Sequence, residues 1–265
     1  MNCCVKDVRK SEKFELNFVT TKPTNMNRIF LAAAFIIITF TSCRFVSDKR
    51  IYGNGIIKSE PRPVSTFSSV DVSGGINVFV KQDSVASVKI EGDENLLEYV
   101  QLRVDGSTLT IREEEGFNLR SITGIKVYVS GPSFKHFEAS GACDIYSENK
   151  ISSSNDISIQ AAGASSITME LHAPNVKAEL TGASRIRLNG ETKTFSADGS
   201  GASGIKCFEL MTEETDVEVS GASHAEVFAS VKLDLHASGA SSVKYKGNAT
   251  IKQEANGASS VSKAE

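Results

Sequence analysis

The chain has 265 residues, 40% of them hydrophobic, and a formal net charge of −3 at pH 7. It contains no cluster of Lys and Arg, so nucleic acid is excluded as a partner, because phosphate binding needs concentrated positive charge. Twenty glycines, five prolines, no tryptophan and only 7% aromatic residues favour many short strands joined by small-residue turns, as in an all-β protein.

The first recognisable segment is an export signal. Met26-Asn27-Arg28 precedes twelve uncharged residues, Ile29–Phe40, and the small residues Thr41-Ser42 before Cys43. The apolar run is shorter than the ~20 residues that a membrane-spanning helix needs. The residues before the cysteine resemble the lipobox of bacterial lipoproteins, with Phe40 in place of the usual leucine. We therefore predict a lipoprotein signal peptide over residues 26–42 and a lipid anchor on Cys43; the alternative is a buried helix or uncleaved anchor with an ordinary thiol.

The segments around this signal have simpler interpretations. Residues 1–25 precede the basic start of the signal, where no sequence is expected, and we interpret them as an upstream extension from a mis-called start. Residues 43–59 are predicted to be a linker. Arg44–Asp48 lacks the acidic run that sends some lipoproteins to the cell surface, so an outer-membrane anchor facing the periplasm is slightly preferred.

Residues 60–135 are predicted to form an atypical N-terminal β part. Residues 69–80 alternate apolar and polar side chains around Gly74-Gly75, and Asp105-Gly106 is a good hairpin turn between two further strands. Residues 93–100 fit a short helix. We expect this part to cap the solenoid described next, because terminal repeats cover the exposed end of the core.

From residue 136 to 265 a Gly-Ala-Ser motif recurs. The glycines of the motif are spaced by 18 to 22 residues, and Gly75 is expected to begin the series. A period of this length indicates a solenoid. The corner glycines are Gly75, Gly141, Gly163, Gly182, Gly201, Gly221, Gly239 and Gly257.

The pattern within each copy distinguishes between kinds of solenoid. Apolar residues occupy positions −6, −4 and −2 before most of these glycines, as in Val176, Ala178 and Leu180, and position +4 is Ile, Val or Ala. This period of two indicates one strand before each corner and another after it, with no helical spacing. The sequence therefore predicts a single-stranded parallel β-helix. Glycine would allow a positive φ at the corner, and Ala and Ser are small enough to stack.

Position −3 faces outward and is mostly acidic. Glu179, Asp198 and Glu218 would lie about 5 Å apart on successive coils, close enough for Ca²⁺ or a cationic ligand to relieve their repulsion. The alternative is a solvated acidic ladder, partly neutralised by Lys177 and Lys252. We favour the solvated ladder and predict no bound metal or cofactor.

Enzymatic chemistry is weakly supported. β-Helical polysaccharide lyases and hydrolases use paired acids or a basic proton acceptor, and the candidate set here is Asp198 and Glu218 with Arg187 or Lys206. The coils are short and uniform, without a long loop to wall a cleft. Cys143 and Cys207 are too far apart in the repeat for a disulfide. No catalytic residue is therefore predicted.

Two segments carry a family resemblance. Residues 67–78, with the triplet Gly75-Ile76-Asn77, and Val127–Ser130 leading into the Ser-Gly-Ala array resemble the head GIN domain family of auto-transporter adhesins. The likeness covers roughly residues 60–265. It implies a right-handed β-helix, export to the envelope and an adhesive role, and it supplies no catalytic site.

Taken together, these observations predict a lipid-anchored, non-catalytic envelope module that binds glycan or protein. The alternative non-enzymatic role is a structural scaffold that assembles with itself, as a homo-oligomer, or with other lipoproteins. An exposed aromatic patch would favour binding, and Tyr146, Tyr245 and Phe208 are the residues that could contribute to one.

Overall fold

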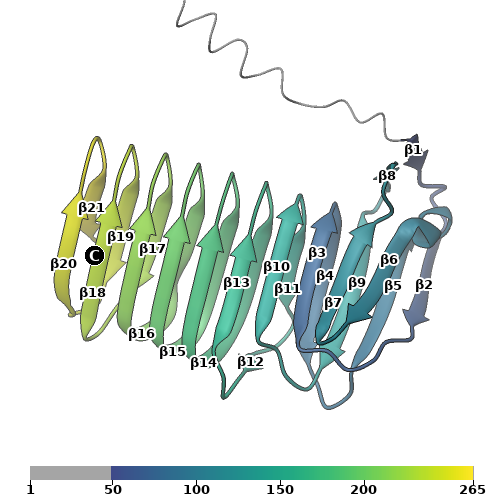
Figure 1. Cartoon of the computed structure of the whole chain (residues 1–265), viewed down its shortest axis with the longest axis horizontal. Coiled ribbons are helices and arrows are strands. Elements are labelled where there is room, and N and C mark those ends of the chain that lie inside the picture. Colours follow the sequence, from purple (N-terminus) through teal and green to yellow (C-terminus); the bar gives the residue numbers. More distant parts are fainter. Residues whose placement is uncertain (1–48, 265) are drawn as a thin grey trace, which may run out of the picture. The chain divides into compact units, whose positions relative to one another are not determined.

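The computed structural model of the protein describes residues 49–264, and these form a parallel β-solenoid, which confirms the predicted fold class (Figure 1). The buried core lies within the compact unit Ser47–Glu265. No helix among the described residues is long and apolar enough to cross a membrane. Residues 1–48, with the predicted signal peptide and Cys43, lie outside the described residues.

Each regular coil contributes strands to two facing layers. The leading sheet holds the strands before the corner glycines, and the trailing sheet holds those after them. In the leading sheet these are β3 (Ser69–Gly74), β10 (His136–Gly141), β13 (Ile157–Ala161), β18 (Lys232–Ala237) and β20 (Thr250–Ala255). In the trailing sheet they are β9 (Ile125–Gly131), β4 (Ile76–Gln82), β11 (Asp144–Ser147), β17 (His224–Phe228), β19 (Ser242–Lys246) and β21 (Ser260–Lys263).

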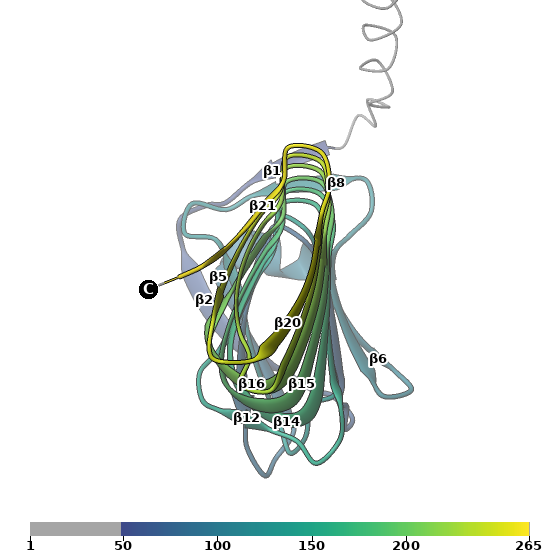
Figure 2. The same cartoon turned by 90° about the vertical axis from the view of Figure 1, so that its left-hand side faces the viewer.

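Three long strands run through both layers and join them into one hydrogen-bonded array. They are β14 (Ser166–Leu180), β15 (Arg185–Gly199) and β16 (Gly204–Val219), and the short β12 (Ile151–Ser152) pairs with β14 near the bend. The coil-to-coil pairings from β3 and β4 to β20 and β21 are parallel, and their register is constant except for a shift between Arg187 and Asn189 where β15 pairs with β16. Seen from the end, the stacked coils enclose a narrow interior that tapers toward the glycine corner (Figure 2).

The N-terminal part ends the solenoid with antiparallel strands. β6 (Val100–Asp105) and β7 (Thr108–Glu113) form an antiparallel hairpin at the predicted turn. β7 in turn pairs in parallel with β3. On the trailing side, β5 (Ser87–Asp93) lies antiparallel to β9, and β2 (Ile57–Arg62) lies antiparallel to β5. The predicted short helix is a 3₁₀ helix, η1 (Glu94–Tyr99), which buries Leu96 and Leu97 against the core. The expected cap is therefore present.

The linker prediction is wrong for residues 49–59. β1 (Lys49–Tyr52) pairs in parallel with β8 (Phe117–Arg120), and β2 begins at Ile57. Little in the sequence indicates these strands, because β1 and β2 are mostly exposed and lack an apolar alternation. Their partners come from distant parts of the chain, so pairing and not local pattern determines them.

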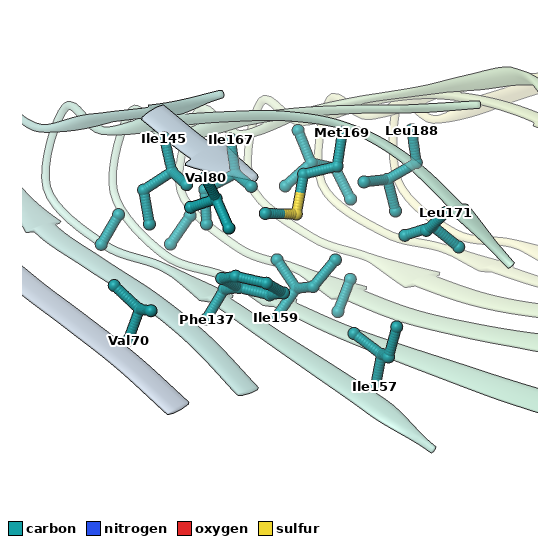
Figure 3. Close-up of a cluster of buried hydrophobic side chains, with 14 of the residues drawn as sticks. Val70, Val80, Phe137, Ile145, Ile157, Ile159, Ile167, Met169, Leu171 and Leu188 are labelled. Atoms are coloured by element: carbon teal, nitrogen blue, oxygen red, sulfur yellow. The ribbon is translucent and has the colours of Figure 1, made fainter. Parts of the chain in front are cut away.

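The alternation predicted for the repeats accounts for the core. Val176, Ala178 and Leu180 are all buried, and the isoleucines at position +4 face them from the other sheet. Figure 3 shows Phe137 and Ile159 of the leading sheet opposite Ile145, Ile167 and Met169 of the trailing sheet. The solenoid interior is thus filled by aliphatic side chains in stacked rows.

At the glycine corners the backbones of neighbouring coils approach each other closely. Each corner glycine has a positive φ, for example +85° at Gly201. A Cβ atom at Gly201 would lie 2.7 Å from the carbonyl oxygen of Gly182, and that oxygen accepts a hydrogen bond of 2.8 Å from the Ala202 N–H. Only glycine satisfies both the conformation and the close approach.

One corner assignment from the sequence is off by one residue. Gly74, and not Gly75, pairs with Gly141 and has the positive φ, +108°. Gly75 aligns with the alanine of later coils, since Ile76 occupies the inward position that is Cys143 in the next coil. The doubled glycine concealed this register, because either residue could have adopted the left-handed conformation.

The serines that end the Gly-Ala-Ser motifs point inward and form a buried row. Ser203 Oγ lies 3.0 Å from Ser223 Oγ, and the Ser241 hydroxyl donates to the Ser238 carbonyl at 2.7 Å. Cys143 takes the same inward position, is fully buried, and its burial raises the pKa of the thiol to about 11. Both Cys143 and Cys207 are free, as their separation in the repeat predicts, and both are buried.

Asp93 ties the exposed N-terminal loops to the cap. Its buried carboxylate accepts hydrogen bonds from the Ser121 hydroxyl at 2.5 Å, the Gly55 N–H at 2.8 Å and the Ile122 N–H at 3.1 Å. The Ser121 hydroxyl, followed by the two amides, outweighs burial and lowers the pKa of Asp93. A Cβ at Gly53 would lie 2.3 Å from the Asp93 Cγ, so the chain passes directly over the carboxylate.

Replacing a corner glycine should destabilise the solenoid. We expect Gly201→Ala to lower the free energy of unfolding by about 2 kcal/mol or more, because of left-handed strain and contact with the Gly182 carbonyl. Thermal unfolding would then shift by roughly 4–8 °C. The matched control is Gly204→Ala, where φ is not positive and the new Cβ meets only the flexible Arg185 side chain, 3.4 Å from its Cγ. Equal melting temperatures for the two variants would contradict the corner constraint.

The Asp93 site should make stability depend on acid pH. We expect Asp93→Asn to lower the free energy of unfolding by about 1–3 kcal/mol at neutral pH, because the buried donors lose a charged acceptor. The folded-state pKa is lowered, so this contribution is complete above the unfolded value of about 3.9 and is lost as pH falls through the folded pKa. Urea unfolding of both proteins from neutral to acid pH measures it. If the difference in free energy of unfolding between the two proteins were the same at every pH, the carboxylate charge would not be involved.

Candidate functional site

The acidic row predicted at position −3 exists on the outside of the leading sheet. The register places Glu179 beside Asp198 and Asp198 beside Glu218. A shallow hollow of about 330 Å³ lies along these three residues. The row extends in both directions through the pairs of adjacent strands, and its members are Asp71, Glu138, Gln160, Glu179, Asp198, Glu218, His236 and Glu254.

The row faces solvent, and a lysine of the same sheet partly neutralises it. Lys177 Nζ lies 2.7 Å from Glu179 Oε1, and this contact raises the pKa of the lysine. At the N-terminal end, partial burial and then the neighbouring Glu138 raise the pKa of Asp71. Among residues 49–264, no group of three or more His, Cys, Asp and Glu side chains is arranged to hold a metal ion. The carboxylates share a row but do not converge on one point.

The candidate catalytic set is split between the two sheets. Asp198 pairs with Glu179 in the leading sheet, whereas Arg187 of the same strand pairs with Thr168 in the trailing sheet. Lys206 and Glu218 are separated in the same way along β16. Outward side chains of opposite sheets point to opposite sides of the buried core. Arg187 and Lys206 are therefore not brought together with Asp198 and Glu218, so the structure does not assemble this candidate set.

An aromatic ladder marks the outside of the trailing sheet. The register places Tyr128 of β9 beside Phe79 of β4, and Phe79 beside Tyr146 of β11. The ring centroids of Tyr128 and Phe79 are 5.2 Å apart at an interplanar angle of 21°, and those of Phe79 and Tyr146 are 5.6 Å apart at 23°. The three rings are half-buried and alternate with core valines and isoleucines. They form a stacked, solvent-facing apolar strip.

Polar groups surround one end of this ladder. Lys89 of β5 lies opposite Tyr128, with its Nζ 4.4 Å from the ring centroid. A hollow of about 270 Å³ adjoins them and brings together donors and acceptors of both charges. Its lining residues include Lys81, Asp83, Ser87, Ser130 and Glu148. Aromatic faces beside hydrogen-bonding groups suit a ligand with both apolar faces and hydroxyl groups.

Sequence reasoning found only part of this ladder. Tyr146 was singled out and lies in it, but Phe79 and Tyr128 come from the irregular N-terminal part and were missed. Tyr245 instead packs against the core, and Phe208 lies beside Lys246, 4.9 Å from the ring centroid to Nζ. The available signal was the alternation in residues 76–80 and 125–131, which already placed Phe79 and Tyr128 between inward-facing valines.

Removing one charge from the acidic row tests whether its carboxylates repel one another. We expect Asp198→Asn to raise the free energy of unfolding by about 0.2–1 kcal/mol at low salt, because it removes the central charge between Glu179 and Glu218. The gain should vanish near 1 M NaCl, where charges are screened. Millimolar CaCl₂ should leave the melting temperature of the wild type unchanged. A calcium-dependent increase that Asp198→Asn abolishes would contradict the solvated ladder.

Comparison with known families identifies one match. The profile of the family described as "Putative auto-transporter adhesin, head GIN domain" matches residues 66–249, more than half of the chain. These residues include the aromatic ladder and most of the glycine corners. A comparison with curated proteins returned no match.

Several crystal structures share the fold. A protein from Bacteroides fragilis described as "a putative adhesin" is 18% identical, with a TM-score of 0.74, and covers 81% of this chain and 100% of its own. A "putative lipid binding protein" from Parabacteroides distasonis is 21% identical, with a TM-score of 0.68, covering 82% and 100%. A "putative adhesin" from Parabacteroides merdae is 18% identical at a TM-score of 0.64, covering 82% and 100%. At these identities the likeness concerns the fold alone.

Proposed function

The chain belongs to the head GIN domain family of adhesins, and from this premise we propose that it is a non-catalytic, carbohydrate-binding adhesin-like module of the cell envelope. The binding surface in this proposal is the outside of the trailing sheet. The absence of convergence among acids and bases across the two sheets supports a binding role over hydrolysis or elimination.

The aromatic ladder carries the proposal. Tyr128, Phe79 and Tyr146 present parallel ring faces on a rigid sheet, and their half-exposed state leaves apolar area available to a ligand. Sugar rings have apolar C–H faces that pack on aromatic rings, while their hydroxyl groups need nearby donors and acceptors. The hollow beside Tyr128 supplies both kinds of polar group. Because β-strands fix the rings, little side-chain entropy would be lost on binding.

The position of this module in the cell follows from the start of the chain. In our proposal residues 26–42 direct export, and Cys43 carries the lipid that holds the protein on the periplasmic side of the outer membrane. The apolar run before Cys43 and the lipobox-like Thr41-Ser42-Cys43 support this placement. β1 begins at Lys49, so only a few residues separate the proposed anchor from the solenoid.

Removing rings from the ladder should weaken carbohydrate binding. We expect Tyr128→Ala combined with Tyr146→Ala to reduce affinity about tenfold or more, because each stacked aromatic contact contributes roughly 0.5–1.5 kcal/mol. A glycan array followed by titration of its hits with the full-length chain in detergent provides the measurement. Tyr52→Ala is the matched control, because Tyr52 is exposed on β1 away from the ladder.

Circular dichroism and thermal unfolding of each variant show whether the solenoid is intact. Undiminished binding by the folded double variant would refute the ladder as the site. A folded wild type that binds no carbohydrate on the array would refute the proposed function itself.

A further inference from the structure

We propose that the carbohydrate ligand is an acidic polysaccharide chain that lies along the solenoid axis, from the aromatic ladder to the basic pair Arg187 and Lys206. This inference rests on the proposed function and specifies the ligand class. It concerns a continuous strip on the outside of the trailing sheet, here called the ligand strip, and its members are Tyr128, Phe79, Tyr146, Thr168, Arg187 and Lys206.

The strip is a single row in the register of the sheet. Tyr146 pairs with Thr168, Thr168 with Arg187, and Arg187 with Lys206. Neighbouring strands of a sheet are about 4.8 Å apart, so the basic pair begins two strands beyond the last aromatic ring. An extended polymer lying across the strands would therefore meet aromatic faces first and positive charges next.

The basic pair is available to a ligand. Arg187 and Lys206 are both exposed, and neither forms an ion pair with any of the described residues, nor does the neighbouring Arg185. Elsewhere on the solenoid, exposed lysines such as Lys177 and Lys252 contact carboxylates of their own sheet. Unpaired basic side chains at adjacent strands can each receive a carboxylate or sulfate group.

A hollow beside the basic pair, like the one beside Tyr128, combines an aromatic ring with side chains of both charges. It has a volume of about 290 Å³, and the Phe208 ring lies in its wall next to Arg187 and Lys206. A register shift between Arg187 and Asn189 marks the bulge that brings Phe208 to this position. Glu209 and Glu226 also line the hollow, and Glu226 follows Lys206 in the row. Glu226 interrupts the positive stretch after Lys206, and we take it as one end of the ligand strip, although Lys244 follows it in the row.

The distribution of charge between the two sheets favours an anionic ligand on this side only. The outward row of the leading sheet carries six carboxylates, those of Asp71, Glu138, Glu179, Asp198, Glu218 and Glu254. An acidic polymer is repelled by that face and attracted to Arg187 and Lys206. A neutral glycan would gain nothing from this asymmetry, so the charge pattern distinguishes between the two ligand classes.

The experiment compares matched polymers on the full-length protein in detergent. The acidic probes are polygalacturonate, alginate and chondroitin sulfate; the neutral probes are highly methyl-esterified polygalacturonate, which keeps the backbone without the charge, and dextran. We expect at least one acidic probe to bind more tightly than both neutral ones. Arg187→Ala combined with Lys206→Ala should weaken that binding roughly tenfold and reduce its dependence on NaCl.

The matched control is Lys193→Ala combined with Lys232→Ala, which removes two exposed charges outside the ligand strip and should leave affinity unchanged. Binding of neutral and acidic probes with equal affinity, or binding that the Arg187 and Lys206 variant leaves intact, would overturn this inference while the proposed function stands. Poly-L-glutamate binding as tightly as the acidic glycans would show a general anion surface and would also overturn it. Failure of all these probes, together with a glycan array on which the folded protein binds nothing, would instead refute the proposed function.

Discussion

The solenoid depends on the close approach of backbone to backbone at the glycine corners. The carbonyl oxygen of one corner glycine accepts a hydrogen bond from the alanine N–H of the next coil, and a side chain on the next glycine would occupy the same space. This contact recurs from Gly74 to Gly257 and sets one common register. Because the corner cannot slip, every inward position stacks on an inward position and every outward position on an outward one.

A fixed register converts a short repeat into long rows of like side chains. Inside, the rows make a continuous aliphatic core, and behind the corner they make the buried serine row that includes Cys143. Outside, they make an acidic ladder on the leading sheet and the ligand strip on the trailing sheet. The chain bends between the two sheets within each coil. Residues of one strand, such as Arg187 and Asp198, therefore lie on opposite sides of the core and belong to different outer rows.

The N-terminal part closes one end of the core and also contributes side chains to the proposed binding surface. Antiparallel strands β2, β5 and β6 close one end of the core, and Asp93 holds the loops that cover it. The same part contributes Phe79 and Tyr128 to the aromatic ladder, while the first regular coil contributes Tyr146. The proposed binding surface therefore lies across the junction of cap and repeat, where the uniform coils alone would offer no stacked aromatic rings.

Patterns in the sequence are sufficient to predict the solenoid, the inward and outward positions of each repeat and the left-handed corner at glycines such as Gly201. These features follow from a period of two within each strand and a period near nineteen between coils, both of which can be counted along the chain. Features that depend on distant partners are visible only in the folded chain: the pairing of β1 with β8, the positive φ at Gly74 and not at Gly75, and the alignment of Tyr128 and Phe79 with Tyr146. Tyr128 and Phe79 are 49 residues apart in sequence and become neighbours only because β9 and β4 pair in parallel. Such partners are selected by hydrogen bonding between strands and not by local propensity. For the same reason, only the folded chain shows that Arg187 and Lys206 lie on the opposite sheet from Asp198 and Glu218.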